Sequence, residues 1–244
     1  LCTSYFASRN RFSKTRIRET LDALGFTEGM IANRSKAEFS RTLHEDGQST
    51  PQRTHSAPTS LPIAFSHHLS HSESLILAGD AGTKIGAAAR IFCSAGIMAG
   101  LYTSQRHDYP VTVKSGFSIS EVMLSPGPIG HPGVEHPAWV IALFPSGLQK
   151  VLPLIQTLPS SSTVYLAADL PMVRTEADVV RIDFSSGGRS LKRRENRGLA
   201  AISAFLLHEN LFDDEALYEA AGIREAYAEQ NQAAVLAGRA LNLA

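Results

Sequence analysis

Cysteine is almost absent from this chain, and that scarcity narrows the class of protein before any motif is considered. The 244 residues include only two cysteines, Cys2 and Cys93. This count excludes a disulfide framework and any four-cysteine metal site built by this chain alone. Cys93 lies in the apolar segment AAARIFCSAGIMAG, where we expect a buried, small hydrophobic residue.

Net charge and long apolar runs are lacking as well. The chain carries 23 basic and 23 acidic residues, so its composition gives no reason to expect a nucleic-acid partner. The longest apolar runs, such as residues 138–144, are far shorter than the roughly 20 residues that cross a bilayer. No charged-then-apolar leader follows Leu1, so we expect a soluble, cytoplasmic protein whose N-terminus is cut or incomplete.

Composition divides the chain into three parts. Residues 1–46 are charged and show helical periodicity, which predicts a short helical appendage. Residues 47–72 are rich in Ser, Thr, Pro, Gln and His and predict a flexible linker with solvated histidines. Residues 73–244 alternate short apolar runs with helical stretches. That alternation predicts an α/β fold, a Rossmann-like three-layer domain with a mainly parallel sheet.

Within this domain the hydrophobic pattern predicts five strands and five helices. Residues 125–137 are too rich in Pro and Gly to form the backbone hydrogen bonds of a strand, so we expect an irregular connection there. We expect strands over 74–78, 116–124, 139–144, 162–167 and 179–183, and helices over 82–99, 146–158, 198–207, 213–221 and 223–240.

The segment GDAGTKIGAAARIF is the most informative motif, because a short apolar strand runs into a glycine turn and then an alanine-rich helix. Such a turn places backbone N–H groups against a phosphate or an acidic partner. A second loop of small residues follows some thirty positions later, and we expect the two to form the walls of one cleft; ordinary loop structure is the alternative. The candidate cleft residues are Gly79, Gly82, Thr83, Lys84, Lys114, Ser115, Gly116 and Ser118.

Other catalytic patterns are weak or missing. The turn lacks the G-x-G-x-x-G spacing of a dinucleotide site, and no Gly-Lys-Ser/Thr follows it as in a P-loop. The sequence shows no recognisable Ser-His-Asp or Cys-His catalytic set, so no catalytic residue is assigned. Glu121 and Asp183 have ordinary structural explanations at strand edges, and the basic run 192–194 is too short to indicate nucleic-acid binding.

Residues 74–240 resemble the gamma-type domain of the thiamine-diphosphate-dependent 2-oxoacid:acceptor (ferredoxin) oxidoreductases, which act on pyruvate, 2-oxoglutarate, indolepyruvate or phenylglyoxylate. The segments that carry the resemblance are the glycine turn before AAARIF, DYPVTVKSGFSISEVMLSPGPI, PAWVIALF, VVRID, NRGLAAISAFL and AEQNQAAVLAG.

The chain departs from the family pattern at two places. Many members carry a G-x-G-G-Q-G turn, where this chain has residues 79–84, GDAGTK. Many also carry Arg-Gly-Gly, where this chain has Lys114, Ser115 and Gly116. Lys114 keeps the positive charge but lacks the planar fork of arginine. Two of the family glycines and the glutamine are missing from the turn, so the resemblance does not carry that turn's ligand contacts over to this chain.

The segment CTSYFASRNR, residues 2–11, is similar to the C-terminal end of the thiamine-diphosphate-binding beta-type subunit of the same enzymes. That likeness implies that Cys2 is a fourth ligand of a 4Fe–4S cluster whose other ligands lie elsewhere. The alternative is a terminal cysteine without a function.

The resemblance implies oxidative decarboxylation of a 2-oxoacid to an acyl-CoA, with electrons passed to ferredoxin or a similar acceptor. It further implies alpha-type and beta-type partner subunits. The assembled complex would contain thiamine diphosphate, Mg²⁺, a 4Fe–4S cluster and coenzyme A, and the partner subunits would make most of the contacts with these groups. This chain, inactive alone, would complete the active site and the assembly. Two other hypotheses stay open: a non-catalytic scaffold subunit, and a self-contained nucleotide-binding oxidoreductase.

Overall fold

The computed structural model describes residues 64–108, 116–131, 133–223 and 225–244, which belong to one unit of the chain, Ser60–Ala244. The predicted helical appendage over residues 1–46 lies outside the described residues, and the division of the chain into three parts stays a prediction.

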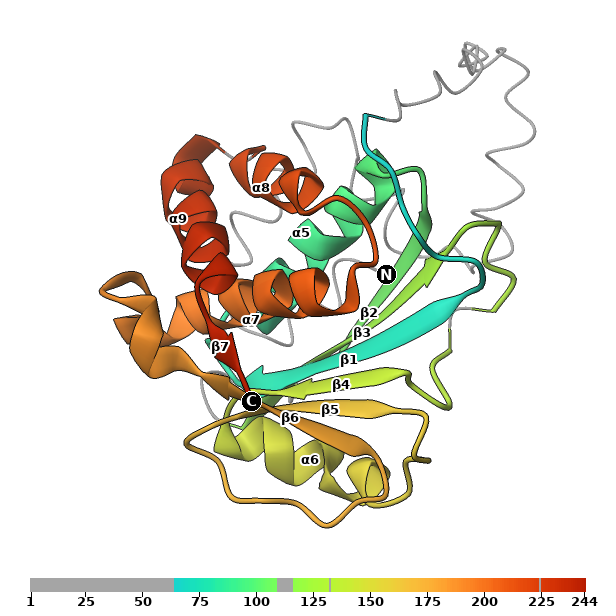
Figure 1. The fold of residues 1–244 in the computed structure, drawn as a ribbon, viewed down its shortest axis with the longest axis vertical. Helices are drawn as coiled ribbons and strands as arrows, with labels where there is room; N and C mark the ends of the chain where they lie inside the picture. Colours follow the sequence, from blue (N-terminus) through green and yellow to red (C-terminus); the bar gives the residue numbers. More distant parts are fainter. Residues whose placement is uncertain (1–63, 109–115, 132, 224) are drawn as a thin grey trace, which may run out of the picture. The chain divides into compact units, whose positions relative to one another are not determined.

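The described residues form one seven-stranded sheet in the order β2-β3-β1-β4-β5-β6-β7 (Figure 1). The four strands β1, β4, β5 and β6 run parallel to one another. Strands β2 and β3 extend the sheet antiparallel beyond β1, and β7 pairs antiparallel with β6. The strands are β1 (Glu73–Asp80), β2 (Tyr102–Asp108), β3 (Phe117–Ser125), β4 (Trp139–Ala142), β5 (Thr163–Ala167), β6 (Asp178–Asp183) and β7 (Asn242–Leu243).

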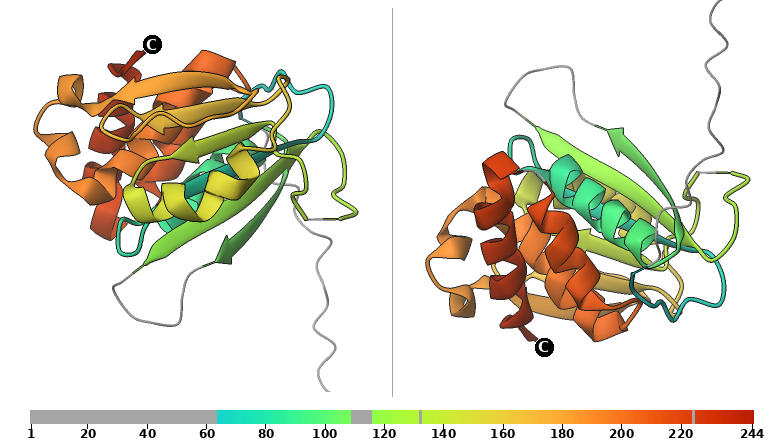
Figure 2. Two further views of the ribbon diagram at one scale, coloured as in Figure 1. Left: turned by 90° about the horizontal axis from the view of Figure 1, so that it is seen from below. Right: turned by 90° about the horizontal axis from the view of Figure 1, so that it is seen from above.

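Helices cover both faces of this sheet, which confirms the predicted three-layer α/β class. Helix α6 (Pro145–Ile155) packs on one face, and α5 (Ile85–Met98), α7 (Arg194–Glu209), α8 (Asp214–Gly222) and α9 (Ala228–Arg239) lie on the other (Figures 1 and 2). All four residues of β4 are buried, as a continuous apolar strand between two helical layers requires.

Helix α7 is largely buried, and its Phe205 is fully buried. Its ring meets Phe92, Trp139 and Tyr165 edge-on, with centroids 6.1, 5.3 and 5.2 Å away. Edge-to-face contacts of this kind add to the hydrophobic stabilisation. These contacts pack α5, α7 and the sheet against one another.

Two strands were not expected from the sequence. Strand β2, with the sequence YTSQRHD, is polar because it is the edge strand and half of its side chains face solvent. Strand β7 has two residues and pairs only with the end of β6. Neither carries the apolar run by which the five expected strands were found.

The end of the predicted linker lies along the domain. Phe65 and Leu69 pack against the core, and His67 forms a β-bridge with Phe212. The backbone N–H and the hydroxyl of Ser66 both donate to Asp213 Oδ2, at 2.8 and 2.9 Å. Residues 64–72 are therefore held against the start of α8.

Candidate functional site

The glycine turn connects the carboxyl end of β1 to α5. Gly82 (φ 86°) and Lys84 (φ 57°) adopt left-handed backbone conformations, and the helix begins at Ile85 rather than at the expected Gly82. The turn is closed by Thr83, whose hydroxyl and N–H both donate to the carbonyl of Asp80, at 2.6 and 3.2 Å. A left-handed residue ends an α-helical pattern, so these two positions set the true start of α5.

Gly79 is required by close packing. A Cβ at this position would lie 2.6 Å from Ile85 Cδ1, and a Cβ at Gly147 would lie 2.3 Å from the backbone nitrogen of Gly79. The first turn of α6 thus approaches the end of β1 more closely than any side chain allows. The two glycines bring the starts of α5 and α6 to the same strand end.

The structure brings together the described members of the predicted cleft. Gly79 pairs in register with Ser118 of β3, and the N–H of Ala81 donates to the carbonyl of Gly116 at 2.8 Å. Gly79, Thr83 and Ser118 are buried and shape the turn, whereas Gly82, Lys84 and Gly116 are exposed. The candidates Lys114, Ser115 and Cys2 lie outside the described residues.

Asp80, which the sequence reasoning did not single out, holds this region together. Its Oδ1 accepts the N–H of Ser146 in the first turn of α6 at 2.9 Å, and its Oδ2 accepts Arg194 at 2.6 Å. The residue before α6, Phe144, offers no side-chain acceptor, so Asp80 caps this helix from a neighbouring strand. The Arg194 guanidinium also lies 4.5 Å from the centre of the Phe144 ring.

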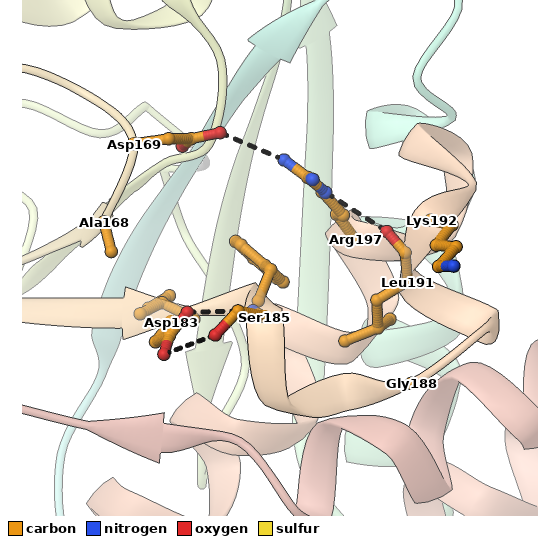
Figure 3. Close-up of a pocket in the computed structure, with 10 residues that line it drawn as sticks. Ala168, Asp169, Asp183, Ser185, Gly188, Leu191, Lys192 and Arg197 are labelled. Carbon is orange, nitrogen blue, oxygen red and sulfur yellow. Dashed lines mark hydrogen bonds and ion pairs between the residues drawn. The ribbon is translucent and has the colours of Figure 1, made fainter.

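A cavity of about 330 Å³ opens at the same edge of the sheet, beyond the ends of β5 and β6 (Figure 3). Ligands of open α/β sheets bind beyond the carboxyl ends of the parallel strands. Arg197 crosses this cavity: it donates to Asp169 at 3.2 Å and to the carbonyl of Leu191 at 3.3 Å. The lining residues are Ala168, Asp169, Ile182, Asp183, Phe184, Ser185, Gly188, Leu191, Lys192 and Arg197.

Asp183 is engaged by its own loop. Its two carboxylate oxygens accept the N–H and the hydroxyl of Ser185, each at 2.8 Å, and these hydrogen bonds hold the pKa of Asp183 below its ordinary value. Lys192, at the rim, is exposed. The cavity therefore holds two carboxylates opposite two cations, and Lys192 is the one left without an ion pair among the residues described here.

A second polar cluster lies between the start of α5 and strands β2 and β3. The Nδ1 of His107 lies 2.7 Å from the hydroxyl of Ser120, and Gln105 donates to the carbonyl of Gly86 at 3.0 Å. Burial, followed by the charge of Arg90, lowers the pKa of His107. Ser120 is fully buried and has no access to a substrate, so the pair tightens the packing of α5 on the sheet.

The expected structural roles of Glu121 and Asp183 are supported. Glu121 forms an ion pair with Arg106, its in-register neighbour on β2, at 2.7 Å.

Cys93 is 7% exposed, and burial raises the pKa of its thiol to about 11. Across the described ranges, no three His, Cys, Asp or Glu side chains are placed to share a metal ion, and no helix is long and apolar enough to cross a membrane.

Comparison with known proteins gives one family match. The family model described as pyruvate ferredoxin/flavodoxin oxidoreductase matches residues 74–241. A search of curated proteins finds no match.

Solved structures with the same fold include three oxidoreductase proteins. They are 2-oxoglutarate:ferredoxin oxidoreductase from Magnetococcus marinus (TM-score 0.60, 17% identity), the gamma subunit of a keto/oxoacid ferredoxin oxidoreductase from Geobacter sulfurreducens PCA (0.56, 20%) and pyruvate oxidoreductase subunit PORC from Thermotoga maritima (0.55, 13%). The matches cover 70%, 68% and 71% of this chain, and 31%, 95% and 99% of the respective structures. The chain thus spans less than a third of the first relative.

Proposed function

The chain belongs to the pyruvate ferredoxin/flavodoxin oxidoreductase family, and on that premise we propose that it is a gamma-type subunit or domain of a 2-oxoacid:acceptor oxidoreductase. The assembled enzyme would decarboxylate a 2-oxoacid oxidatively to an acyl-CoA and pass the electrons to ferredoxin or a similar acceptor. This chain would complete the active site from one side and hold the alpha-type and beta-type partners, with no turnover of its own.

The observation that carries the proposal is the extent of the family match. It runs over residues 74–241, from the first strand to the end of the last helix, and therefore includes every element that builds the carboxyl edge of the sheet. The predicted cleft residues that the structure describes converge at this edge, with Gly82, Lys84 and Gly116 open to a ligand. The Magnetococcus marinus enzyme, which shares the fold, was solved with 2-oxoglutarate, coenzyme A and succinyl-CoA bound.

The described residues fit some of the implied groups and not others. The one described cysteine, Cys93, is buried in α5, and the described residues hold no group suited to a metal ion. We therefore assign thiamine diphosphate, Mg²⁺ and the 4Fe–4S cluster to partner chains, apart from the proposed contribution of Cys2. Thiamine diphosphate would supply the carbanion chemistry when bound.

Coenzyme A is the group that this chain's own edge fits best. Its phosphates are anionic, and the carboxyl edge presents the exposed side chains of Lys84 and Lys192. Nothing lies within 4 Å of the Cβ position of Gly82, so the backbone of the turn before Lys84 is open to close approach, and Gly116 is exposed as well. In this role the chain's residues bind and orient the acyl acceptor, and the bond-breaking steps belong to the partner chains.

One observation favours the scaffold alternative. In the turn, the hydroxyl of Thr83 is bonded to Asp80, and the carboxylate of Asp80 is bonded to Ser146 and Arg194. The hydroxyl of Thr83, which stands where many members have glutamine, and the carboxylate of Asp80 are thus satisfied inside the chain. A subunit that has lost ligand contacts and keeps only assembly contacts would show this pattern.

The test is anaerobic, 2-oxoacid-dependent reduction of a viologen dye in the presence of coenzyme A, with the complex that co-purifies with the chain. Turnover supports the proposal and ranks the 2-oxoacids. An intact complex with thiamine diphosphate bound but no turnover supports the scaffold, and the lack of any co-purifying partner overturns both.

Lys84→Ala in that complex probes the turn itself. We expect kcat/KM for coenzyme A to fall about tenfold, the scale of one lost charge-assisted hydrogen bond. Lys150→Ala is the matched control, because both lysines lie over an aromatic ring: Lys84 over Tyr227 at 5.2 Å, and Lys150, on α6, over Phe117 at 4.9 Å. Equal behaviour of the two variants would contradict a role for the turn in binding.

A further inference from the structure

A second groove, of about 250 Å³, opens between α5 and the start of α9. Both helices lie on the same face of the sheet (Figure 2, right). The groove is separate from the cavity beyond β5 and β6, with which it shares no lining residue. It is lined by Lys84, Ala87, Arg90, Ile91, Tyr227 and Asn231.

The charge of this groove is one-sided. Its two charged lining residues, Lys84 and Arg90, are both basic and exposed, and no carboxylate lines it. Among the residues that the structure describes, neither forms a salt bridge, whereas four other arginines do. The cavity beyond β5 and β6 differs, because there Asp169 and Asp183 balance the cations. An anion in the α5–α9 groove would meet two uncompensated positive charges.

The rest of the groove is apolar and aromatic. Ala87 and Ile91 are half-buried and form one wall, and Tyr227, 50% exposed, forms the other. The Lys84 ammonium lies 5.2 Å from the centre of the Tyr227 ring. This contact holds one cation beside the aromatic ring. The side-chain amide of Asn231 donates to the carbonyl of Ala221 at 3.4 Å and so joins this wall to α8.

We propose that the α5–α9 groove binds a small organic anion, a carboxylate or phosphate carried on a planar apolar body. The planar fork of Arg90 suits the two oxygens of such an anion, and Lys84 adds a point charge. Tyr227, Ala87 and Ile91 bury the apolar part. The volume lies just below the ~300 Å³ at which pockets for drug-sized ligands begin, so the ligand is small.

The groove shares Lys84 with the proposed coenzyme A site, but its test is separate, because it measures binding of small anions and not turnover. Phenyl phosphate and phenylacetate serve as probes, and calorimetry on the full chain, or on its co-purified complex, measures their dissociation constants. We expect Arg90→Gln to weaken both at least tenfold and Tyr227→Ala to weaken them by a similar factor. Lys84 stays intact because it also belongs to the glycine turn, and Lys150→Ala is the control that leaves the constants unchanged.

Two neutral or minimal probes separate the alternatives. Benzyl alcohol has the ring without the charge, and inorganic phosphate has the charge without the ring. Binding of benzyl alcohol as tight as that of phenyl phosphate overturns the anion requirement. Equal binding of inorganic phosphate overturns the apolar requirement, and retention of wild-type affinity by Arg90→Gln and Tyr227→Ala overturns the location.

Discussion

Arg194 donates a hydrogen bond of 2.6 Å to Asp80, although 114 positions separate the two residues in the chain. The contact joins the first turn of α7 to the end of β1, and the other oxygen of Asp80 caps α6. One carboxylate therefore fixes the relative positions of a strand and two helices that lie on opposite faces of the sheet. The exposed glycine turn is built on this junction.

We expect Asp80→Ala to lower the free energy of unfolding by about 1–2 kcal/mol, because it removes the cap of α6. Arg194→Met removes the ion pair and the guanidinium contact with the Phe144 ring but leaves the cap of α6 in place. Because the Arg194 side chain is 55% exposed, we expect a smaller cost of about 0.5 kcal/mol. Urea denaturation of both variants measures the difference. An Arg194→Met variant as unstable as Asp80→Ala would show that the ion pair, and not the cap, carries the stability.

The close approach of α6 to β1 gives a steric test. An added Cβ in Gly147→Ala would lie 2.3 Å from the backbone nitrogen of Gly79, where neither helix nor strand can yield cheaply. We expect a loss of about 2 kcal/mol or more in the free energy of unfolding. Gly127→Ala is the control, since nothing lies within 4 Å of its Cβ position. Thermal denaturation of the two variants gives the comparison.

His107 gives the domain a pH dependence. Its pKa in the folded state lies below the ordinary value of 6.5, so the folded state favours the neutral ring and the unfolded state binds the proton first. The neutral His107 ring therefore makes its full contribution to the free energy of unfolding above pH 6.5. This contribution is lost as the pH falls below that value. We expect His107→Gln to flatten the stability curve between pH 7 and pH 5, measured by denaturation at each pH. An unchanged slope would contradict this assignment.

The thiol of Cys93 is expected to be inert in the folded protein. Its pKa of about 11 and its 7% exposure keep the thiolate scarce and out of reach at neutral pH. In a Cys2→Ser background, we expect a thiol reagent such as DTNB to label Cys93 slowly in buffer and at once in denaturant. Rapid labelling of the folded chain would show that α5 opens locally.

The segment before β1 is held by Asp213. The Ser66 N–H and hydroxyl both donate to this carboxylate and lower its pKa below the ordinary value, so the contact is present at neutral pH and weakens in acid. We expect Asp213→Asn to speed the hydrogen exchange of residues 65–68. Asp178→Asn, on β6, is the control that leaves this exchange unchanged.

The amino-acid sequence determined the layer class and most of the elements. Its short apolar runs and alanine-rich stretches match β1, β3 to β6 and helices α5 to α9 of the described residues, because each of these elements buries a continuous or periodic apolar surface. The apolar pattern did not predict the polar strand β2, because an edge strand needs no apolar run to pair. The sequence also predicted the glycine turn, because glycine and small residues between an expected strand and an expected helix are typical of a turn.

Only the tertiary structure decided which residues meet. Asp80 and Arg194, and the groove residues Arg90 and Tyr227, come from distant segments, and no spacing in the chain brings them together. The order of strands places β1 between β3 and β4, so residues 79 and 118 become neighbours. Long-range contacts of this kind depend on how layers pack, and packing is a property of the whole core rather than of a local pattern.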